Sequence, residues 1–176
     1  MSPGAPVGVV VVVGPPGAGK TTVGELLAER LGVPFRDVDA DIVELAGKPI
    51  SDIFTEDGEP EFRRIECEAV ARALATHDGV LALGGGAVLA ESTRKLLAEH
   101  TVVFLNVGMA EGVRRTGLST ARPLLAGVNP RATFKALLDA RLPLYREVAT
   151  VEIDTDRHEP PAIVDEVVTA LNHKEG

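Results

Sequence analysis

The residues best suited to chemistry form a short glycine-rich segment that follows a run of valines. Residues 14–21 read Gly-Pro-Pro-Gly-Ala-Gly-Lys-Thr and satisfy the pattern G-x-x-x-x-G-K-[ST]. In such a loop the glycines let backbone N–H groups surround a phosphate, and the following helix presents its positive end to the anion. Lys20 is expected to reach the β- and γ-phosphates, and the Thr21 hydroxyl to ligate Mg²⁺. The segment predicts nucleotide binding.

Two carboxylates, Asp37 and Asp39, end the second predicted strand. Residues i and i+2 of an extended chain share a face, so both side chains are expected to point into one cleft. Beside a nucleotide, one carboxylate would hold the metal through water, and the other would accept the proton of an attacking hydroxyl. A second interpretation stays open, in which Asp39 or Asp41 only caps a helix at Ile42–Ala46.

Arginines form the next group of candidates. Arg63 and Arg64 lie outside the apolar stripe of the helix that follows Pro60, and Arg141 is expected near a helix end. A guanidinium donates two parallel hydrogen bonds to a planar carboxylate or to a phosphate. Each of these arginines also fits an ordinary solvated or ion-paired surface position.

Two further segments are rich in glycine. The third predicted strand ends in Gly84-Gly85-Gly86, which either forms a simple turn or allows close backbone approach to a ligand. The stretch from Gly117 to Gly127, with Arg122 near its middle, is either a surface loop or a hinged lid. In a lid, Arg122 would offset the charge that develops during phosphoryl transfer.

These groups require a scaffold, which alternating patterns predict. Short β-branched runs predict strands at Val9–Val13, Phe35–Val38, Val80–Leu83, Val102–Leu105 and Val151–Ile153. Helices are expected before Gly32, after Pro60, from Asn129–Pro130 onward and after Pro160–Pro161. Alternating strands and helices indicate a doubly wound parallel α/β sheet, whose ligands bind beyond the carboxyl ends of the strands.

Composition narrows the function classes. The 176 residues fit one domain spanning 1–176, with 45% hydrophobic and 25% charged residues. A net charge of −8 and only 3% aromatic residues disfavour nucleic acids and anionic membranes as partners. The single cysteine, Cys67, and the shortness of the apolar run Val7–Val13 predict a cytoplasmic protein without a signal peptide or a membrane span. The four histidines show no metal-ligand spacing.

Taken together, the segments resemble the shikimate kinase family, most closely its actinobacterial members, from about Val9 to Leu171. The phosphate loop alone is common to many nucleotide-binding proteins, so the specific signal is an ordered set of motifs. These are Asp37–Asp39, Asp57–Glu66, Gly84–Val88, Arg122–Leu125 and Arg141–Tyr145. The resemblance implies a three-layer α/β/α sandwich with a five-stranded parallel sheet of the nucleoside monophosphate kinase type, built around the P-loop.

The resemblance also implies an activity and residue roles. Such kinases transfer the γ-phosphoryl group of ATP to the 3-hydroxyl of shikimate, on the route to chorismate, with one Mg²⁺ ion, and are generally monomeric. Asp39, Lys20 and Arg122 would be catalytic, and Thr21 and Asp37 would serve the metal. The expected shikimate-binding region covers about 37–66 and the lid about 117–129. The residues expected to contact ATP are Gly17, Ala18, Gly19, Lys20, Thr21, Thr22, Arg115 and Arg122. Those expected to contact shikimate are Asp39, Arg63, Gly84, Gly85, Gly86 and Arg141.

Alternatives stay open at this point. A kinase for another small polyol acid, such as gluconate, would use the same scaffold. A non-catalytic nucleotide-binding module would bind ATP or ADP without phosphate transfer. A nucleoside monophosphate kinase is less consistent with so few aromatic residues. Near the expected adenine site, Arg157 and His158 match the family only loosely.

Overall fold

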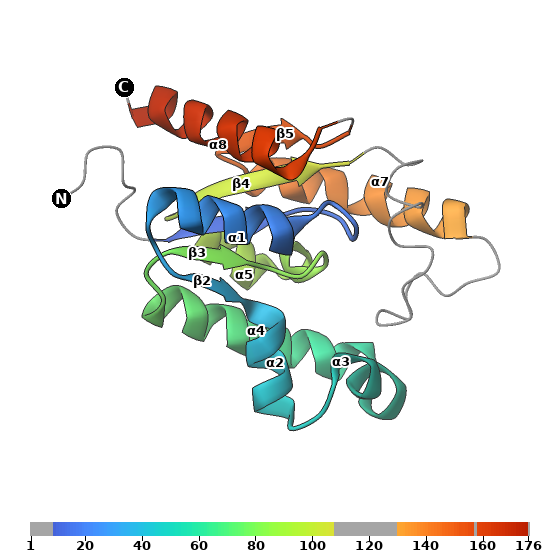
Figure 1. The fold of residues 1–176 in the computed structure, drawn as a ribbon. Helices are drawn as coiled ribbons and strands as arrows, with labels where there is room; N and C mark the ends of the chain where they lie inside the picture. The colour runs from blue at the N-terminus through green and yellow to red at the C-terminus, as the bar shows by residue number, and fades with distance from the viewer. Residues whose placement is uncertain (1–8, 108–129, 157, 176) are drawn as a thin grey trace.

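A parallel sheet of five strands forms the centre of the fold (Figure 1). The computed structural model describes residues 9–107, 130–156 and 158–175. Along the sheet the strand order is β2-β3-β1-β4-β5. The strands are β1 Val10–Val13, β2 Phe35–Asp37, β3 Val80–Ala82, β4 Thr101–Asn106 and β5 Val151–Asp154. All five predicted strands are therefore confirmed, with ends that differ by one residue at most.

Within the described residues, eight helical segments lie between the strands and a ninth, α8, follows the last strand. They are α1 Lys20–Leu31, α2 Val38–Ala46, α3 Ile50–Asp52, η1 Ile53–Asp57, α4 Glu59–Thr76, η2 Ala87–Leu89, α5 Glu91–Leu97, α7 Pro130–Val148 and α8 Pro160–Glu175. The four long helices expected from the sequence are confirmed, and Gly32 ends α1 in the left-handed conformation. The sequence analysis did not predict α3, the π-helical η1, the 3₁₀-helical η2 or α5.

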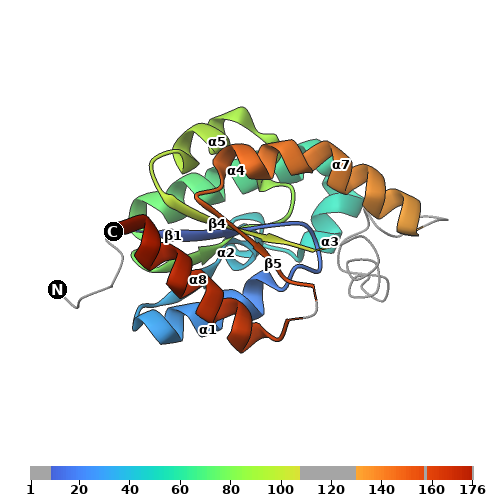
Figure 2. The same ribbon diagram turned by 90° about the horizontal axis from the view of Figure 1, so that it is seen from above.

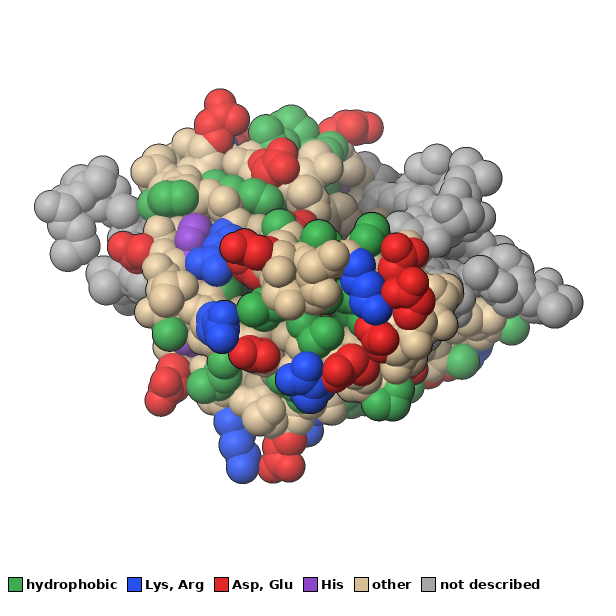
Figure 3. All heavy atoms as spheres, turned by 90° about the horizontal axis from the view of Figure 1, so that it is seen from below, with side chains coloured by type: hydrophobic (Ala, Val, Ile, Leu, Met, Phe, Trp, Pro, Cys, Tyr) green, Lys and Arg blue, Asp and Glu red, His purple; other side chains and the backbone are tan. Residues whose placement is uncertain are grey.

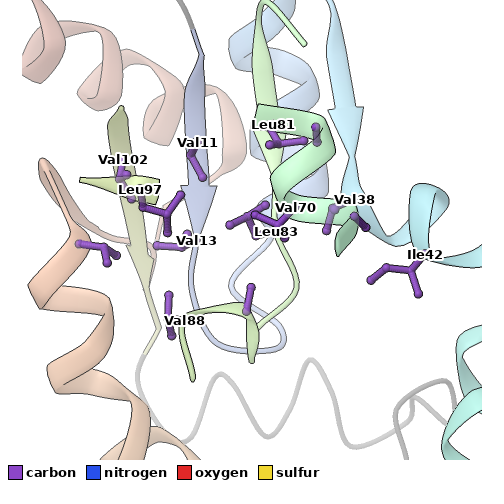
Figure 4. Close-up of a cluster of buried hydrophobic side chains, with 14 of the residues drawn as sticks. Val11, Val13, Val38, Ile42, Val70, Leu81, Leu83, Val88, Leu97 and Val102 are labelled. Atoms are coloured by element: carbon purple, nitrogen blue, oxygen red, sulfur yellow. The ribbon is translucent and has the colours of Figure 1, made fainter. Parts of the chain in front are cut away.

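Helices cover both faces of the sheet (Figure 2). On one face α1 and α8 pack over Val10, Val12 and neighbouring strand residues. On the other face α4, α5 and α7 bury the alternate residues, among them Val11 and Val13. Figure 4 shows side chains of this second core, where Val70 of α4 and Leu97 of α5 lie beside strand residues. β1 is buried on both faces, which explains its unbroken run of valines.

Charged side chains of both signs mix on the surface formed by α2 and α4 (Figure 3). Arg36 pairs with Asp41 there, and Arg72 pairs with Glu68. Along the chain that the structure describes, no helix is both long enough and apolar enough to cross a membrane.

Candidate active site

The phosphate loop connects β1 to α1 at the carboxyl edge of the sheet. Gly17 and Gly19 take positive φ angles of 83° and 84°, a conformation that glycine adopts without strain. The Lys20 ammonium donates to the carbonyl oxygens of Gly14 at 2.8 Å and Pro15 at 3.0 Å. The loop therefore encloses the Lys20 side chain, and the ammonium group lies where the phosphates are expected.

The N-terminus of α1 is suited to an anion. Gly19 is the N-cap residue and has no side chain with which to occupy the first turn. That turn, which the structure describes in full, contains no acidic residue. The positive end of the helix dipole therefore meets no opposing carboxylate within its own first turn. Residues Gly17 through Thr22, predicted to contact ATP, all lie in the loop or at this helix start.

The positions of Asp37 and Asp39 correct the prediction that both side chains share one face of a strand. β2 ends at Asp37 and α2 begins at Val38, so the two residues do not share the face of an extended strand. Asp37 is the N-cap of α2, and its Oδ1 accepts the backbone N–H of Asp39 at 2.9 Å. Neither Asp39 nor Asp41 is the cap; both lie in the first turn. The cap geometry still brings the two carboxylates together.

Thr21 links this acidic pair to the phosphate loop. Its Oγ1 donates to Asp37 Oδ2 at 3.0 Å, across the gap between α1 and β2. Burial raises the pKa of Asp37, and the neighbouring Asp39 charge acts in the same direction, whereas the bonds from Asp39 N–H and Thr21 oppose the shift. A hydroxyl and a carboxylate are hard oxygen donors of the kind that Mg²⁺ prefers.

This donor pair fits Mg²⁺ as nucleotide enzymes usually hold it. Within the described residues, no group of three or more His, Cys, Asp or Glu side chains could enclose a metal ion. Mg²⁺ is commonly bound through one or two protein ligands, with phosphate oxygens and water completing its shell. Thr21 and Asp37 are consistent with that arrangement.

Arg63 reaches the site from α4. Its guanidinium bonds Glu59 Oε2 at 3.2 Å and Glu66 Oε1 at 2.8 Å, and its side chain is only 18% exposed. Glu66 is a buried ion-pair partner of Arg63. Arg64, at the next position, is 65% exposed and pairs with Glu61. The helix therefore turns only Arg63 inward.

Arg141 is a second inward-facing arginine, on α7. It lies inside the helix and not near its end, because α7 continues through Pro143 to Val148. Burial lowers the pKa of Arg141, the Tyr145 hydroxyl opposes that shift, and the Arg63 charge adds to it. Arg63 and Arg141 thus lie close together, beside the carboxylates of Glu66 and Glu59, and their guanidinium groups are the donors that suit an anionic ligand.

The Gly84–Gly86 turn lies between the two halves of the site. A Cβ atom added at Gly85 would lie 3.1 Å from Pro16 of the phosphate loop. One added at Gly86 would overlap the Arg63 guanidinium. The Tyr145 hydroxyl donates to the Gly85 carbonyl oxygen at 2.5 Å. All three glycines are buried, and their lack of side chains permits these approaches.

Of the residues that the resemblance assigns to ATP, shikimate or the metal, all those that the structure describes belong to this one constellation. Arg115, Arg122, the expected lid at 117–129 and Arg157 lie outside the described residues. His158 borders a hollow of about 550 Å³ between β5 and α8.

Sequence reasoning did not predict the burial of Glu66 or a role for Tyr145. Their signals were present as spacing, because Glu66 stands one helical turn after Arg63, and Tyr145 one turn after Arg141.

Comparison with known proteins agrees with this geometry. The shikimate kinase family model matches residues 16–172. The shikimate kinase of Saccharopolyspora erythraea is 77% identical over 90% of each chain, and that of Salinispora arenicola is 60% identical over 93% of this chain and 97% of its own. The structure of shikimate kinase from Acinetobacter baumannii in complex with shikimate superimposes with a TM-score of 0.93, at 36% identity, over 97% of this chain and 96% of that one. The chain therefore belongs to the shikimate kinase family.

Proposed function

We propose that this chain transfers the γ-phosphoryl group of ATP to the 3-hydroxyl of shikimate, giving shikimate 3-phosphate and ADP, through the residues assembled above. The observation that carries the proposal is the Gly84–Gly86 turn, which approaches the phosphate loop at Gly85 and Arg63 at Gly86. A ring acid held by the arginines would thereby lie beside the terminal phosphate of a bound nucleotide. Family membership supports the choice of shikimate as the acceptor.

Positioning and charge neutralisation are the main tasks of the site, because phosphoryl transfer requires little covalent participation by the protein. Asp39 orients the acceptor hydroxyl and takes its proton. Lys20 offsets the charge that develops on the transferred group. Arg122 and Arg115, outside the described residues, are proposed as the lid arginine and the adenine contact on the basis of the family resemblance alone.

Thr21 and Asp37 are the residues proposed to hold Mg²⁺. Their 3.0 Å hydrogen bond places both oxygens beside the first turn of α1, where the phosphates are expected. When bound, Mg²⁺ supplies charge neutralisation at the β- and γ-phosphate oxygens. Burial raises the pKa of Asp37, so a nearby cation would favour the charged form of this carboxylate.

An ADP-release assay with ATP and Mg²⁺ tests the proposal directly. Shikimate, gluconate and a reaction without acceptor form the three arms. Release that depends on shikimate is the expected result. Release that depends on gluconate would assign a different acceptor, and nucleotide binding without release in any arm would indicate a non-catalytic module.

Arg63→Gln should raise the KM for shikimate roughly 10- to 150-fold, because it removes charge-assisted hydrogen bonds worth about 1.5–3 kcal/mol. The KM for ATP should change much less. Steady-state kinetics with each substrate varied in turn measures both values. Arg64→Gln is the matched control, since Arg64 is the exposed neighbour on the same helix. Equal losses for both substrates in Arg63→Gln would contradict the assignment.

Gly86→Ala should weaken shikimate binding through Arg63. The new methyl group would occupy the space of the guanidinium, which has to move away from the expected carboxylate. We expect the KM for shikimate to rise about tenfold, as for the loss of a contact worth ~1.4 kcal/mol. Gly85→Ala is the matched variant: its methyl group faces Pro16, so its main effect should fall on the KM for ATP. The same response in both variants would refute this division of the turn.

The proposal includes a monomeric, cytoplasmic enzyme that binds neither nucleic acid nor membranes. The single cysteine and the net charge of −8 support these points. Sedimentation of the purified chain would test the oligomeric state.

A further inference from the structure

Tyr145 has no assigned part in the chemistry above, yet it occupies the junction between the two ends of the acceptor site. It is the only tyrosine of the chain and is fully buried. Its ring stacks on Phe104 of β4, with centroids 4.9 Å apart. Its hydroxyl donates to Gly85 O at 2.5 Å, and Arg141 stands one helical turn before it on α7.

Arg141 and Tyr145 are four residues apart on α7, so their side chains leave the same face of the helix. The Tyr145 hydroxyl bonds the Gly85 carbonyl oxygen and thereby ties this face of α7 to the Gly84–Gly86 turn. This bond therefore helps to fix how far Arg141 lies from the turn.

We infer that Tyr145 is a positioning residue that sets the separation between the carboxylate-binding arginine and the backbone turn facing the ring of shikimate. The inference rests on the proposed roles of Arg141 and Gly84–Gly86. Burial raises the pKa of Tyr145 to about 12, so the phenol remains a neutral donor throughout the physiological range.

A second contact ties α7 to η2, the segment that directly follows the turn, so the fold should survive loss of the hydroxyl. Arg94 of α5 donates to the carbonyl oxygens of Val88 and Leu89 in η2 at 2.7 and 3.1 Å, and it pairs with Glu147 of α7 at 3.0 Å. η2 therefore stays linked to α7 when Tyr145 is replaced by phenylalanine. The phenyl ring also preserves the stacking on Phe104.

Tyr145→Phe should raise the KM for shikimate roughly tenfold, the loss expected for hydrogen bonds worth ~1.4 kcal/mol, and leave the KM for ATP unchanged. Thr150→Val is the matched control. It removes a hydroxyl that accepts the Val102 N–H at 3.0 Å, near the amino end of β4. It should lower the melting temperature to a similar extent without altering either KM. A Tyr145→Phe enzyme with an unchanged KM for shikimate, or with equal losses for both substrates, would overturn the inference.

A double-mutant cycle separates this inference from the proposed function. In an Arg141→Met background, adding Tyr145→Phe should cost less than the roughly tenfold expected in the wild-type background, because the arginine to be positioned is gone. A full additional loss would overturn the inference. If Arg141→Met itself does not weaken shikimate binding, the site assignment fails and the inference with it. If it does weaken binding but Tyr145→Phe does not, only the inference fails.

The wild-type protein offers a measurement that requires no variant to fold. The chain has one tyrosine and no tryptophan, so its near-ultraviolet tyrosine absorption reports Tyr145 alone. Shikimate bound between Arg141 and the Gly84–Gly86 turn should perturb that absorption by changing the bond between the phenol and the Gly85 carbonyl. A difference spectrum that saturates with shikimate supports the inference, and an unchanged spectrum at saturation would overturn it.

Discussion

Asp39→Asn is expected to lower kcat for shikimate phosphorylation by roughly 10²- to 10⁴-fold, the usual contribution of a positioned general base. The amide keeps the size of the side chain but cannot take the proton of the acceptor hydroxyl. Since the bond that anchors this residue uses its backbone N–H to Asp37, the start of α2 should survive the change. Initial rates at saturating substrates, measured together with thermal unfolding, test both statements.

Asp41→Asn is the control for this variant. Asp41 lies in the same first turn of α2, but its carboxylate is paired with Arg36 at 2.9 Å. Its replacement should reduce stability slightly and leave kcat intact. Near-normal turnover by Asp39→Asn, or an equal decrease in both variants, would remove Asp39 from the chemical step.

Lys20→Met should lower kcat by roughly 10²- to 10³-fold, as when one preorganised donor to a developing negative charge is lost. The ammonium lies within the phosphate loop on the Gly14 and Pro15 carbonyls, close to the N-terminus of α1. Methionine retains most of the length of the chain but brings no charge to the phosphates. Stopped-time product analysis, with ATP affinity measured separately, distinguishes loss of catalysis from loss of binding.

Lys95→Met is the matched control for Lys20→Met. Lys95 is 76% exposed on α5, where it pairs with Glu91. Its replacement by methionine removes the same charge from the protein. Unchanged kinetics are expected for it. If Lys20→Met retained full kcat, the loop lysine would serve nucleotide binding alone.

The strands were predictable because the sheet is parallel and covered on both faces. Such strands require apolar residues at consecutive positions, and the sequences of β1 and β4 each contain an uninterrupted apolar run. The long helices were equally clear, since Gly32 and Pro130 mark an end and a start. Local sequence patterns were therefore sufficient to predict the strands and the long helices.

What sequence reasoning missed depends on tertiary contacts. The pattern around Asp37 fits both an extended strand and a helix cap, and the bonds to Thr21 and Asp39 accompany the cap. Arg141 was expected near a helix end, yet α7 continues through Pro143, although proline usually interrupts a helix. Burial of Glu66 next to two arginines comes from the packing of α4 against its neighbours, which spacing alone does not reveal.

The adjacency of Gly85 and Gly86 has a consequence for inhibitor design. One peptide unit separates the contact with the phosphate loop from the contact with Arg63, and covalent geometry prevents that unit from stretching. A bisubstrate compound that joins a polyphosphate mimic to a cyclic carboxylic acid therefore needs a short, stiff tether. Each added methylene would dilute the effective concentration of the second half and forfeit the avidity that tethering provides.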